Sequence, residues 1–254
     1  MADEVLYDVR DGIARLTINR PAQRNAIDKA VREGLRAGFA DFDADEDARV
    51  LILTGAGDRA FCAGGDLKEM AETSLGVPPP DFLVQPGRNV RVDKPIIGAI
   101  NGFALAGGFQ LAQSCDLVVA ADTATFGITE ARVGRGAPWA APLPWLVPPR
   151  IAMEILMTAA PITAQRAYEV GLVNKVCPLA DLMAEAEKLA RTIAANAPLS
   201  VMASKKMVYE SAEHGRTRAF DVADEIWDPV YRSADAVEGP LSFKEKREPV
   251  WTGC

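Results

Sequence analysis

Apolar residues near the start of the chain fall into two short runs that flank Asp11-Gly12, a dipeptide that favours a tight hairpin turn. The two runs predict β-strands near residues 4–9 and 13–19. Pro21 ends the second run, because proline removes a backbone donor from a strand. The chain is therefore expected to open with a β-hairpin.

Apolar patterns further along separate a strand-rich part from a helical part. Asp28 precedes a stretch with helical spacing, and three continuous apolar runs predict buried strands: ARVLILTGAG, KPIIGAI and DLVVAAD. Between the last two lies NGFALAGGFQLAQSC, which predicts a turn followed by a short helix. Helical spacing then dominates the segments RIAMEILMT, ITAQRAYEVG, LADLMAEAEKLARTIAANA, PLSVMASKKMVYESA and TRAFDVADEIW. We expect an α/β core over residues 1–195 and a helical oligomerisation region over residues 196–254, in one continuous catalytic unit.

Composition limits the partners and the compartment. The 254 residues are 49% hydrophobic and 25% charged, which is enough for one sizeable core without disulfide or metal staples. A net charge of -7 opposes binding to nucleic acid or to an anionic membrane. The longest apolar runs are shorter than the roughly 18 residues of a membrane span, and the start has no signal-peptide pattern. Four cysteines without a paired spacing fit a reducing compartment, so we expect a cytoplasmic protein.

The residue inventory also limits the chemistry. His214 is the only histidine and lies in a polar stretch, so Ser/His/Asp and Cys/His nucleophilic schemes have little support. Zinc-binding spacings are absent from the sequence, and no metal site is expected. The segment VLILTGAGDRA matches a dinucleotide fingerprint, but it runs into AFCAGGDL where that site requires a helix. Carboxylates, lysines or backbone amides must therefore carry any catalysis.

Two glycine-rich turns are the most informative motifs. The segments Phe61–Leu67 and Asn101–Leu111 each bring glycines to the point where a helix begins after an apolar run. Either segment alone is most simply a tight turn, because glycine is the usual turn residue. Together, two such turns facing one another would form an oxyanion hole made of backbone N–H groups.

With these motifs the chain closely resembles the crotonase superfamily, the enoyl-CoA hydratase/isomerase family. The resemblance rests on RPAQRNAID, AFCAGGDLKEM, DKPIIGAINGFALAGGFQLAQSCD, FGITEARVG, ITAQRAYEVGLVNKV and EGPLSFKEKREPVW. The last segment is most similar to carnitinyl-CoA dehydratase-like members. The resemblance implies a spiral of ββα units with a helical C-terminal trimerisation region. It also implies that the amides of Gly65 and Gly107 bind a thioester oxygen.

The resemblance places Glu130 at one of the two positions where family hydratases carry a catalytic glutamate, and Gln110 at the other. An amide does not take a proton from water near neutral pH, so the usual two-carboxylate scheme for hydration lacks one member. Family isomerases commonly work with a lone glutamate at the position of Glu130. Hydration of an enoyl-CoA, or the reverse dehydration that forms it, and double-bond isomerisation of an enoyl-CoA therefore both stay open. A non-catalytic acyl-CoA-binding protein is a further alternative, supported only by Gln110.

The resemblance also implies contacts with the coenzyme A part of the substrate, which would enter as a thioester and not as a resident cofactor. For each basic residue a solvated surface position is an equally good interpretation. The segment RVGRGAPWAAPLPWLVPP departs from the family pattern, so the acyl-pocket wall is not predicted. We expect a homotrimer or a hexamer. The expected contacts are Arg24, Ala26, Ala63, Asp66, Leu67 and Lys68 from one subunit, with Phe243 and Lys246 from a neighbouring one.

Overall fold

The computed structural model of the protein describes residues 4–72 and 76–254. Its larger sheet has six strands, of which the first pair is antiparallel and every other neighbouring pair is parallel. In spatial order these strands are β1 (Val5–Arg10), β2 (Ile13–Ile18), β3 (Val50–Gly55), β5 (Ile96–Ile100), β7 (Leu117–Ala121) and β10 (Lys175–Cys177).

The predicted hairpin is present. Asp11 has φ of 51° and Gly12 has φ of 75°, so both central residues of the turn lie in the left-handed region that a type I′ hairpin requires. Strands β3, β5 and β7 match the three continuous apolar runs, and all residues of β3 and β5 are buried.

A smaller second sheet was not predicted from the sequence. It contains β4 (Ala60–Cys62), β6 (Phe103–Leu105), β8 (Thr125–Gly127) and β9 (Ile162–Thr163), in that spatial order. Strands β4, β6 and β8 are parallel, and β9 is antiparallel to β8. Strands of two or three residues carry too little pattern to be recognised, yet the carboxyl ends of the first three position the candidate site.

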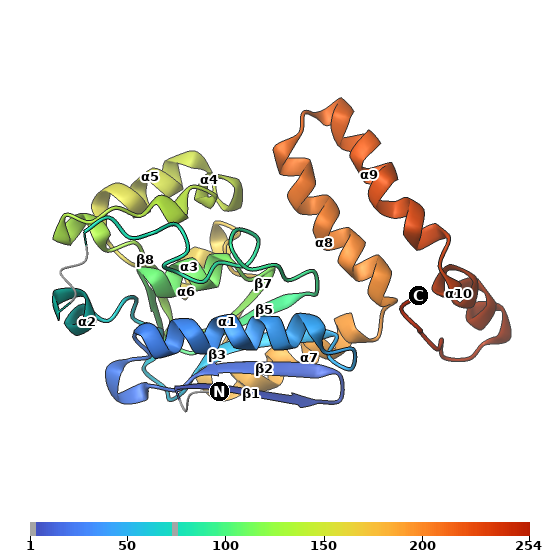
Figure 1. Cartoon of the computed structure of the whole chain (residues 1–254), viewed down its shortest axis with the longest axis horizontal. Helices are drawn as coiled ribbons and strands as arrows, with labels where there is room; N and C mark the ends of the chain where they lie inside the picture. The colour runs from blue at the N-terminus through green and yellow to red at the C-terminus, as the bar shows by residue number, and fades with distance from the viewer. Residues whose placement is uncertain (1–3, 73–75) are drawn as a thin grey trace.

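Helices cover the larger sheet. Helix α1 (Lys29–Ala44) packs on β1 and β2, and α7 (Leu182–Ala194) packs on β2, β3, β5 and β7 (Figure 1). Helix α1 begins where predicted, because the Asp28 side chain accepts a hydrogen bond of 2.9 Å from the Val31 amide. The arrangement of parallel strands and helices confirms the predicted α/β fold class.

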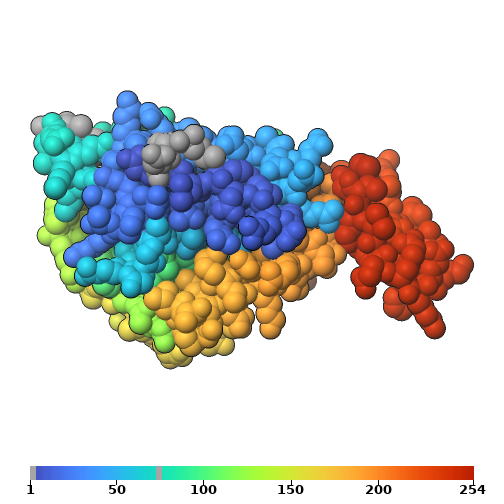
Figure 2. Space-filling model, turned by 90° about the horizontal axis from the view of Figure 1, so that it is seen from below, coloured from blue at the N-terminus to red at the C-terminus, as the bar shows by residue number. Residues whose placement is uncertain are grey.

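The remaining helices include three long ones at the C-terminal end, which project from the rounded body of the molecule (Figures 1 and 2). Helix α10 was not predicted, since its residues include Gly239 and Pro240, which interrupt helical patterns. None of the helices within the described ranges has the length and apolar character needed to cross a bilayer. The remaining α-helices are α2 (Leu67–Glu72), α3 (Gly107–Gln113), α4 (Leu143–Leu146), α5 (Pro149–Thr158), α6 (Ala164–Glu169), α8 (Pro198–Glu213), α9 (Arg216–Tyr231) and α10 (Ala234–Glu245), and short 3₁₀ helices are formed by Pro21–Gln23, Glu130–Val133, Pro138–Ala140 and Leu179–Asp181.

A polar cluster attaches α8 to the larger sheet. The Asp116 carboxylate, just before β7, forms an ion pair of 2.9 Å with Lys205 and accepts a hydrogen bond of 2.9 Å from the Tyr209 hydroxyl. It also accepts a bond of 2.7 Å from the Ile96 amide at the start of β5. One mostly buried carboxylate thus joins two strands of the core to the first of the projecting helices.

Candidate active site

The three principal residues of the predicted site follow three neighbouring strands. Gly65 lies three residues after β4, Gly107 two residues after β6, and Glu130 three residues after β8. Strands β4 and β8 both pair with β6 in parallel. Because adjacent strands are about 4.8 Å apart, their carboxyl ends meet at one edge of the sheet. The structure therefore brings these three residues to the same edge.

The two glycine-rich turns contact one another directly. A methyl group added to Gly64 would lie 3.3 Å from the amide nitrogen of Gly107 and 2.7 Å from the Ala106 side chain. One added to Gly108 would lie only 2.0 Å from the carbonyl oxygen of Cys62, closer than any side chain permits. The close approach of the two turns thus depends on glycine at positions 64 and 108.

Two backbone N–H groups are unpaired at this junction. In the part of the chain that the structure describes, neither the Gly65 amide nor the Gly107 amide donates a hydrogen bond to another protein atom. Ala106, directly before Gly107, has φ of 52° and ψ of -123°, a conformation that costs alanine about 1–3 kcal/mol. Its amide donates a 2.9 Å bond to the carbonyl of Gly127 at the end of β8, which stabilises that conformation.

Glu130 lies at the start of a 3₁₀ helix with much of its carboxyl group buried. Burial raises its pKa, and the nearby N–H groups of its own backbone, of the Trp139 side chain and of the Thr129 backbone only partly oppose that rise. Its Oε2 atom is buried and has no hydrogen-bond partner among the described residues. A carboxyl group with a raised pKa and one open oxygen is suited to take up and return a proton.

Gln110 is fully buried, and its amide is held in one orientation. Its Nε2 atom donates to the carbonyl of Val84 at 3.1 Å and to the hydroxyl of Ser114 at 3.3 Å. Because a backbone carbonyl only accepts hydrogen bonds, the nitrogen must face Val84. The opposite atom, Oε1, is buried without a partner among the described residues, so the free face of this side chain accepts hydrogen bonds.

Sequence analysis missed the residues around these two side chains. Trp139 lies in the segment whose departure from the family pattern was noted, but its influence on the pKa of Glu130 was not foreseen. Val84 and Gln85 lie between the predicted strands ARVLILTGAG and KPIIGAI, in a stretch for which no element was predicted. A buried polar side chain such as Gln110 requires a partner, but the sequence did not indicate which backbone group would supply it.

Three of the predicted coenzyme A contacts lie close together. The Ala63 amide donates a 3.1 Å bond to the carbonyl of Arg24, and the turn that contains Arg24 and Ala26 thereby lies beside the first glycine-rich turn. Leu67 and Lys68 follow at the exposed start of α2. This proximity does not test the contacts with coenzyme A, which stay predictions.

The Asp66 carboxylate is occupied within the protein. It accepts hydrogen bonds from Arg20 at 3.1 Å and from the Lys68 amide at 3.0 Å, and a longer one from the Glu69 amide. Burial alone would raise the pKa of Asp66, but the bonds from Arg20 and from the two amides outweigh burial and lower it. Asp66 therefore anchors the first turn of α2, and a contact with substrate stays a prediction.

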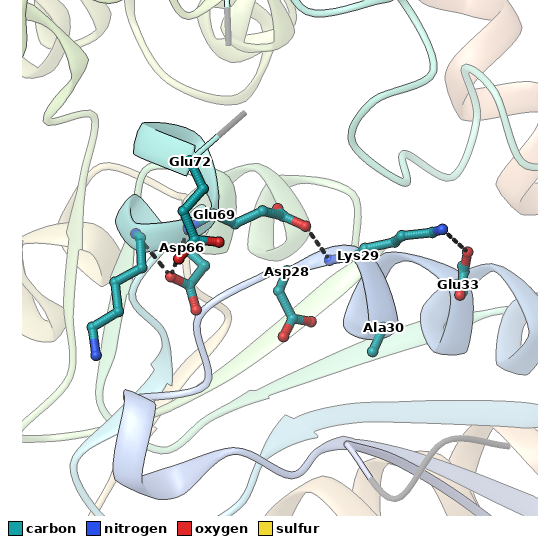
Figure 3. A pocket seen from close by; sticks show the side chains of 8 residues that line it. Asp28, Lys29, Ala30, Glu33, Asp66, Glu69 and Glu72 are labelled. Carbon is teal, nitrogen blue, oxygen red and sulfur yellow. Dashed lines mark hydrogen bonds and ion pairs between the residues drawn. The ribbon is translucent and has the colours of Figure 1, made fainter. Parts of the chain in front are cut away.

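A cavity of about 510 Å³ lies between α1 and α2 (Figure 3), and Lys68 is one of the residues that line it. The lining has five carboxylates and two lysines, so its side chains do not form a basic patch. Arg20 pairs with two of the carboxylates, and Arg32 pairs with Glu69 at 2.7 Å. A phosphate contact by Lys68 would therefore form beside several acidic groups. The lining residues are Asp28, Lys29, Ala30, Glu33, Asp66, Lys68, Glu69 and Glu72.

Phe243 and Lys246 are not brought to the site within one chain. Phe243 is 87% exposed on α10, and Lys246 ends that helix with φ of 55°. Helix α10 lies at the far end of the projecting helices, away from α2 and α3 (Figure 1). The prediction that both residues serve a neighbouring subunit remains a prediction.

The sequence and the fold have clear counterparts among known proteins. The sequence profile of the enoyl-CoA hydratase/isomerase family matches residues 8–254, and the protein belongs to that family of crotonase-type enzymes. Carnitinyl-CoA dehydratase of Escherichia coli K12 is 38% identical over 98% of this chain and 99% of its own length.

Two solved structures are similarly close. A probable enoyl-CoA hydratase/isomerase from Mycobacterium abscessus is 43% identical, with a TM-score of 0.89 and complete coverage of both chains. An enoyl-CoA hydratase from Mycobacterium tuberculosis H37Rv is 40% identical, with a TM-score of 0.90 and 99% coverage of each chain. These likenesses confirm the predicted membership of the crotonase superfamily.

Proposed function

We propose that this enzyme binds the thioester carbonyl of an acyl-CoA on the amides of Gly65 and Gly107 and isomerises 3-enoyl-CoA to 2-enoyl-CoA with Glu130. The observation that carries the proposal is the chemistry beside these amides, where Glu130 is a carboxyl group with a raised pKa and Gln110 is an amide. Isomerisation needs one group that removes and returns a proton, whereas hydration ordinarily uses two carboxylates.

The proposed reaction moves one proton. The Glu130 carboxylate removes a proton from C2 of the 3-enoyl thioester, and the electron pair shifts onto the thioester oxygen as a dienolate. The two N–H groups stabilise that developing charge more strongly than the neutral carbonyl. The protonated Glu130 then delivers the proton to C4, the double bond settles between C2 and C3, and the carboxylate is regenerated.

Dehydration of a 3-hydroxyacyl-CoA is the second candidate, and the free Oε1 atom of Gln110 favours it. That atom would accept a hydrogen bond from the substrate hydroxyl and orient it. Glu130 would remove the C2 proton and then protonate the departing hydroxyl, which leaves as water. The similarity to carnitinyl-CoA dehydratase supports the same reaction class. In either reaction, coenzyme A is part of the substrate, and no resident cofactor is needed.

The assembly that we propose is a homotrimer or a hexamer. Large apolar side chains stay exposed on the projecting helices, including Phe220, Tyr231, Val237 and Phe243. Burying such surface is the usual reason for a helical region to associate.

The test is to follow 3-enoyl-CoA and 2-enoyl-CoA with the purified protein, using chromatography to separate isomerised, hydrated and unchanged thioesters. We expect isomerisation to be faster than hydration, and Glu130→Gln to lower it at least about 10²-fold, because a positioned acid–base group contributes that much. Glu154→Gln, on the exposed face of α5, is the matched control and should keep full activity.

Three results would contradict the proposal. Full activity in Glu130→Gln would remove that residue from the mechanism. Robust hydration without isomerisation would favour the two-carboxylate class of reaction. Saturable acyl-CoA binding by calorimetry, without turnover of enoyl or hydroxyacyl thioesters, would indicate the non-catalytic binding protein.

A further inference from the structure

Ile27 is bonded through its backbone to the residues on both sides of Gly65. Its N–H donates a 2.8 Å hydrogen bond to the carbonyl of Gly64, and its carbonyl accepts a 2.9 Å bond from the amide of Asp66. These two bonds form a parallel bridge between Ile27 and Gly65. Ile27 thus pairs with the first glycine-rich turn as a strand would, and the pairing leaves the Gly65 N–H unused.

The bond to Gly64 determines the direction of the Gly65 N–H. The carbonyl of Gly64 and the N–H of Gly65 belong to one peptide unit, and the described residues contain no cis peptide bond. In a planar trans peptide the C=O and the N–H point in opposite directions. Because this carbonyl points at Ile27, the N–H points away from Ile27. Two glycines flank the peptide and restrict its rotation little, so the bond from Ile27 is what holds its orientation.

The side chain of the same residue packs against the second donor. A methyl group added to Gly107 would lie 3.3 Å from Cδ1 of Ile27 and 3.7 Å from the α-carbon of Gly64. Ile27 is 2% exposed, so its side chain is enclosed by packing. One residue therefore contacts both turns: its backbone directs the Gly65 N–H, and its side chain limits the movement of Gly107.

The Arg20 guanidinium fixes the position of Ile27. Its Nη1 atom donates to the carbonyl of Ala26 at 2.8 Å and to the Asp66 carboxylate at 3.1 Å, and its Nη2 atom pairs with the Asp28 carboxylate at 3.1 Å. These partners are the residue before Ile27, the residue after it, and the residue after the first donor. The Arg20 side chain is 14% exposed. A rigid guanidinium fork serves three partners in set directions, which the compact ammonium group of lysine cannot do.

We propose that Ile27 is a positioning residue for both backbone donors of the site, and that Arg20 holds it in register between them. The proposal rests on the proposed function, in which the amides of Gly65 and Gly107 bind the thioester oxygen. It adds that the geometry of both amides depends on one residue outside the two glycine-rich turns. A side chain without acid–base chemistry thereby affects the rate of the reaction.

The sequence offers a direct measurement of both amides without substrate. It contains two Gly-Gly pairs, at residues 64–65 and 107–108. In protein labelled with glycine that carries ¹³C at the carbonyl carbon and ¹⁵N at the amide, an NMR experiment that correlates each amide with the preceding carbonyl gives one signal for each pair. The first signal joins the Gly65 N–H to the Gly64 carbonyl, which accepts the bond from Ile27. Gly65→Ala removes this signal and so assigns it.

Two variants should displace these signals differently. Arg20→Lys keeps the charge and loses the fork, so it should move both signals, with the Gly64 carbonyl carbon shifted upfield as its hydrogen bond weakens. Ile27→Val removes only Cδ1, so it should move the signal of residues 107–108 and leave the other nearly in place. Lys205→Met is the control, because Lys205 is also 14% exposed and ion-paired but attaches α8. It should move neither signal.

The second readout is the separate measurement of kcat and KM for 3-enoyl-CoA. Arg20→Lys should lower kcat about 10²-fold, because a donor misplaced by about 1 Å loses that much rate. KM should change little, since the donors bind the developing negative charge more strongly than the neutral carbonyl. Ile27→Val should lower kcat by a smaller factor. Lys205→Met should keep the kcat of the unchanged protein at a temperature where it is folded.

The outcomes separate the two proposals. Unmoved glycine signals in folded Arg20→Lys, or in Ile27→Val where Arg20→Lys does not fold, would overturn the positioning role, even if turnover fell. Equal displacements in Lys205→Met would overturn it as well, because they would reflect a general loosening of the fold. Displaced signals with an unchanged kcat would support the positioning role and overturn the proposed function. Displaced signals with a lower kcat and a preserved KM are the expected result.

Discussion

Replacing Gln110 by glutamate would place a second carboxyl group in the site, and the surroundings of Gln110 determine how it behaves. The substitution removes the nitrogen that donates to the carbonyl of Val84 and to the hydroxyl of Ser114. An ionised carboxylate would face the Val84 oxygen with no proton between them. A neutral carboxylic acid would keep one donor there. The new side chain should therefore hold its proton well above the ordinary glutamate pKa of about 4.3.

The cost follows from the same contact. Leaving the buried Val84 carbonyl without a donor costs about 1–3 kcal/mol, and the protonated acid avoids most of that cost. Because the pKa is raised in the folded state, the stabilising proton is fully bound below about pH 4.3 and is lost as pH rises through the folded-state pKa. The variant should therefore lose about 1–3 kcal/mol of unfolding free energy, relative to the unchanged protein, between pH 5 and pH 8.

Activity should follow the same titration. Only the ionised form of the new glutamate can activate water, so hydration of 2-enoyl-CoA by Gln110→Glu should increase with pH, to as much as about 10²-fold over the unchanged protein. Urea unfolding at pH 5 and pH 8, with hydration rates over the same range, measures both effects. Gln110→Met is the control, because it lacks the donor but cannot ionise, and its stability loss should not depend on pH. Equal stability losses at both pH values for Gln110→Glu, or full hydration already at pH 5, would refute this reasoning.

Two further predictions concern stability. Gly108→Ala should lower the unfolding free energy by at least about 1–3 kcal/mol, because the added methyl group would lie 2.0 Å from the carbonyl oxygen of Cys62. Lys205→Met should lower it by about 3 kcal/mol, because the mostly buried Asp116 carboxylate would lose its ion-pair partner. Urea unfolding followed by circular dichroism measures both changes.

Each of these variants has a matched control. A methyl group added to Gly136 would approach no atom closer than 3.9 Å, so Gly136→Ala should change stability little. Lys206→Met alters the exposed lysine next to Lys205 and should also be near neutral. If Gly108→Ala were as stable as Gly136→Ala, the two turns would not be as close as described. Equal effects of Lys205→Met and Lys206→Met would show that the ion pair does not attach α8.

The features that were predictable from the sequence are those that depend on a continuous apolar run or on residues a few positions apart. Strand β3 is a continuous apolar run of six residues, and Asp28 is a helix cap whose partner, Val31, is three residues away. Glu130 and the glycine turns were recognised by their resemblance to a family. Strands β4 and β6 were missed because three residues show no periodicity, although their pairing places the two turns side by side.

The orientation of the polar side chains was beyond sequence analysis. Gln110 was identified as an amide at a carboxylate position, but its direction depends on the Val84 carbonyl, which is 26 positions away in the chain. Trp139 was visible only as a departure from the family pattern. Its place depends on how the loop after Glu130 folds back and on a contact with Gln85, 54 positions away. Such tertiary contacts leave no local pattern in the sequence.

The two donors proposed for the thioester oxygen belong to the main chain. The site therefore combines side-chain groups, which a substitution can replace, with backbone groups, which nearly every substitution leaves in place. A substitution can delete the acid, change the packing around it or exchange the amide of Gln110. No substitution other than proline removes the N–H of Gly65 or Gly107; other changes act on it only by displacing the peptide. Single side-chain substitutions can therefore change the acyl preference or the acid–base residues of the site while the two amides continue to bind the carbonyl.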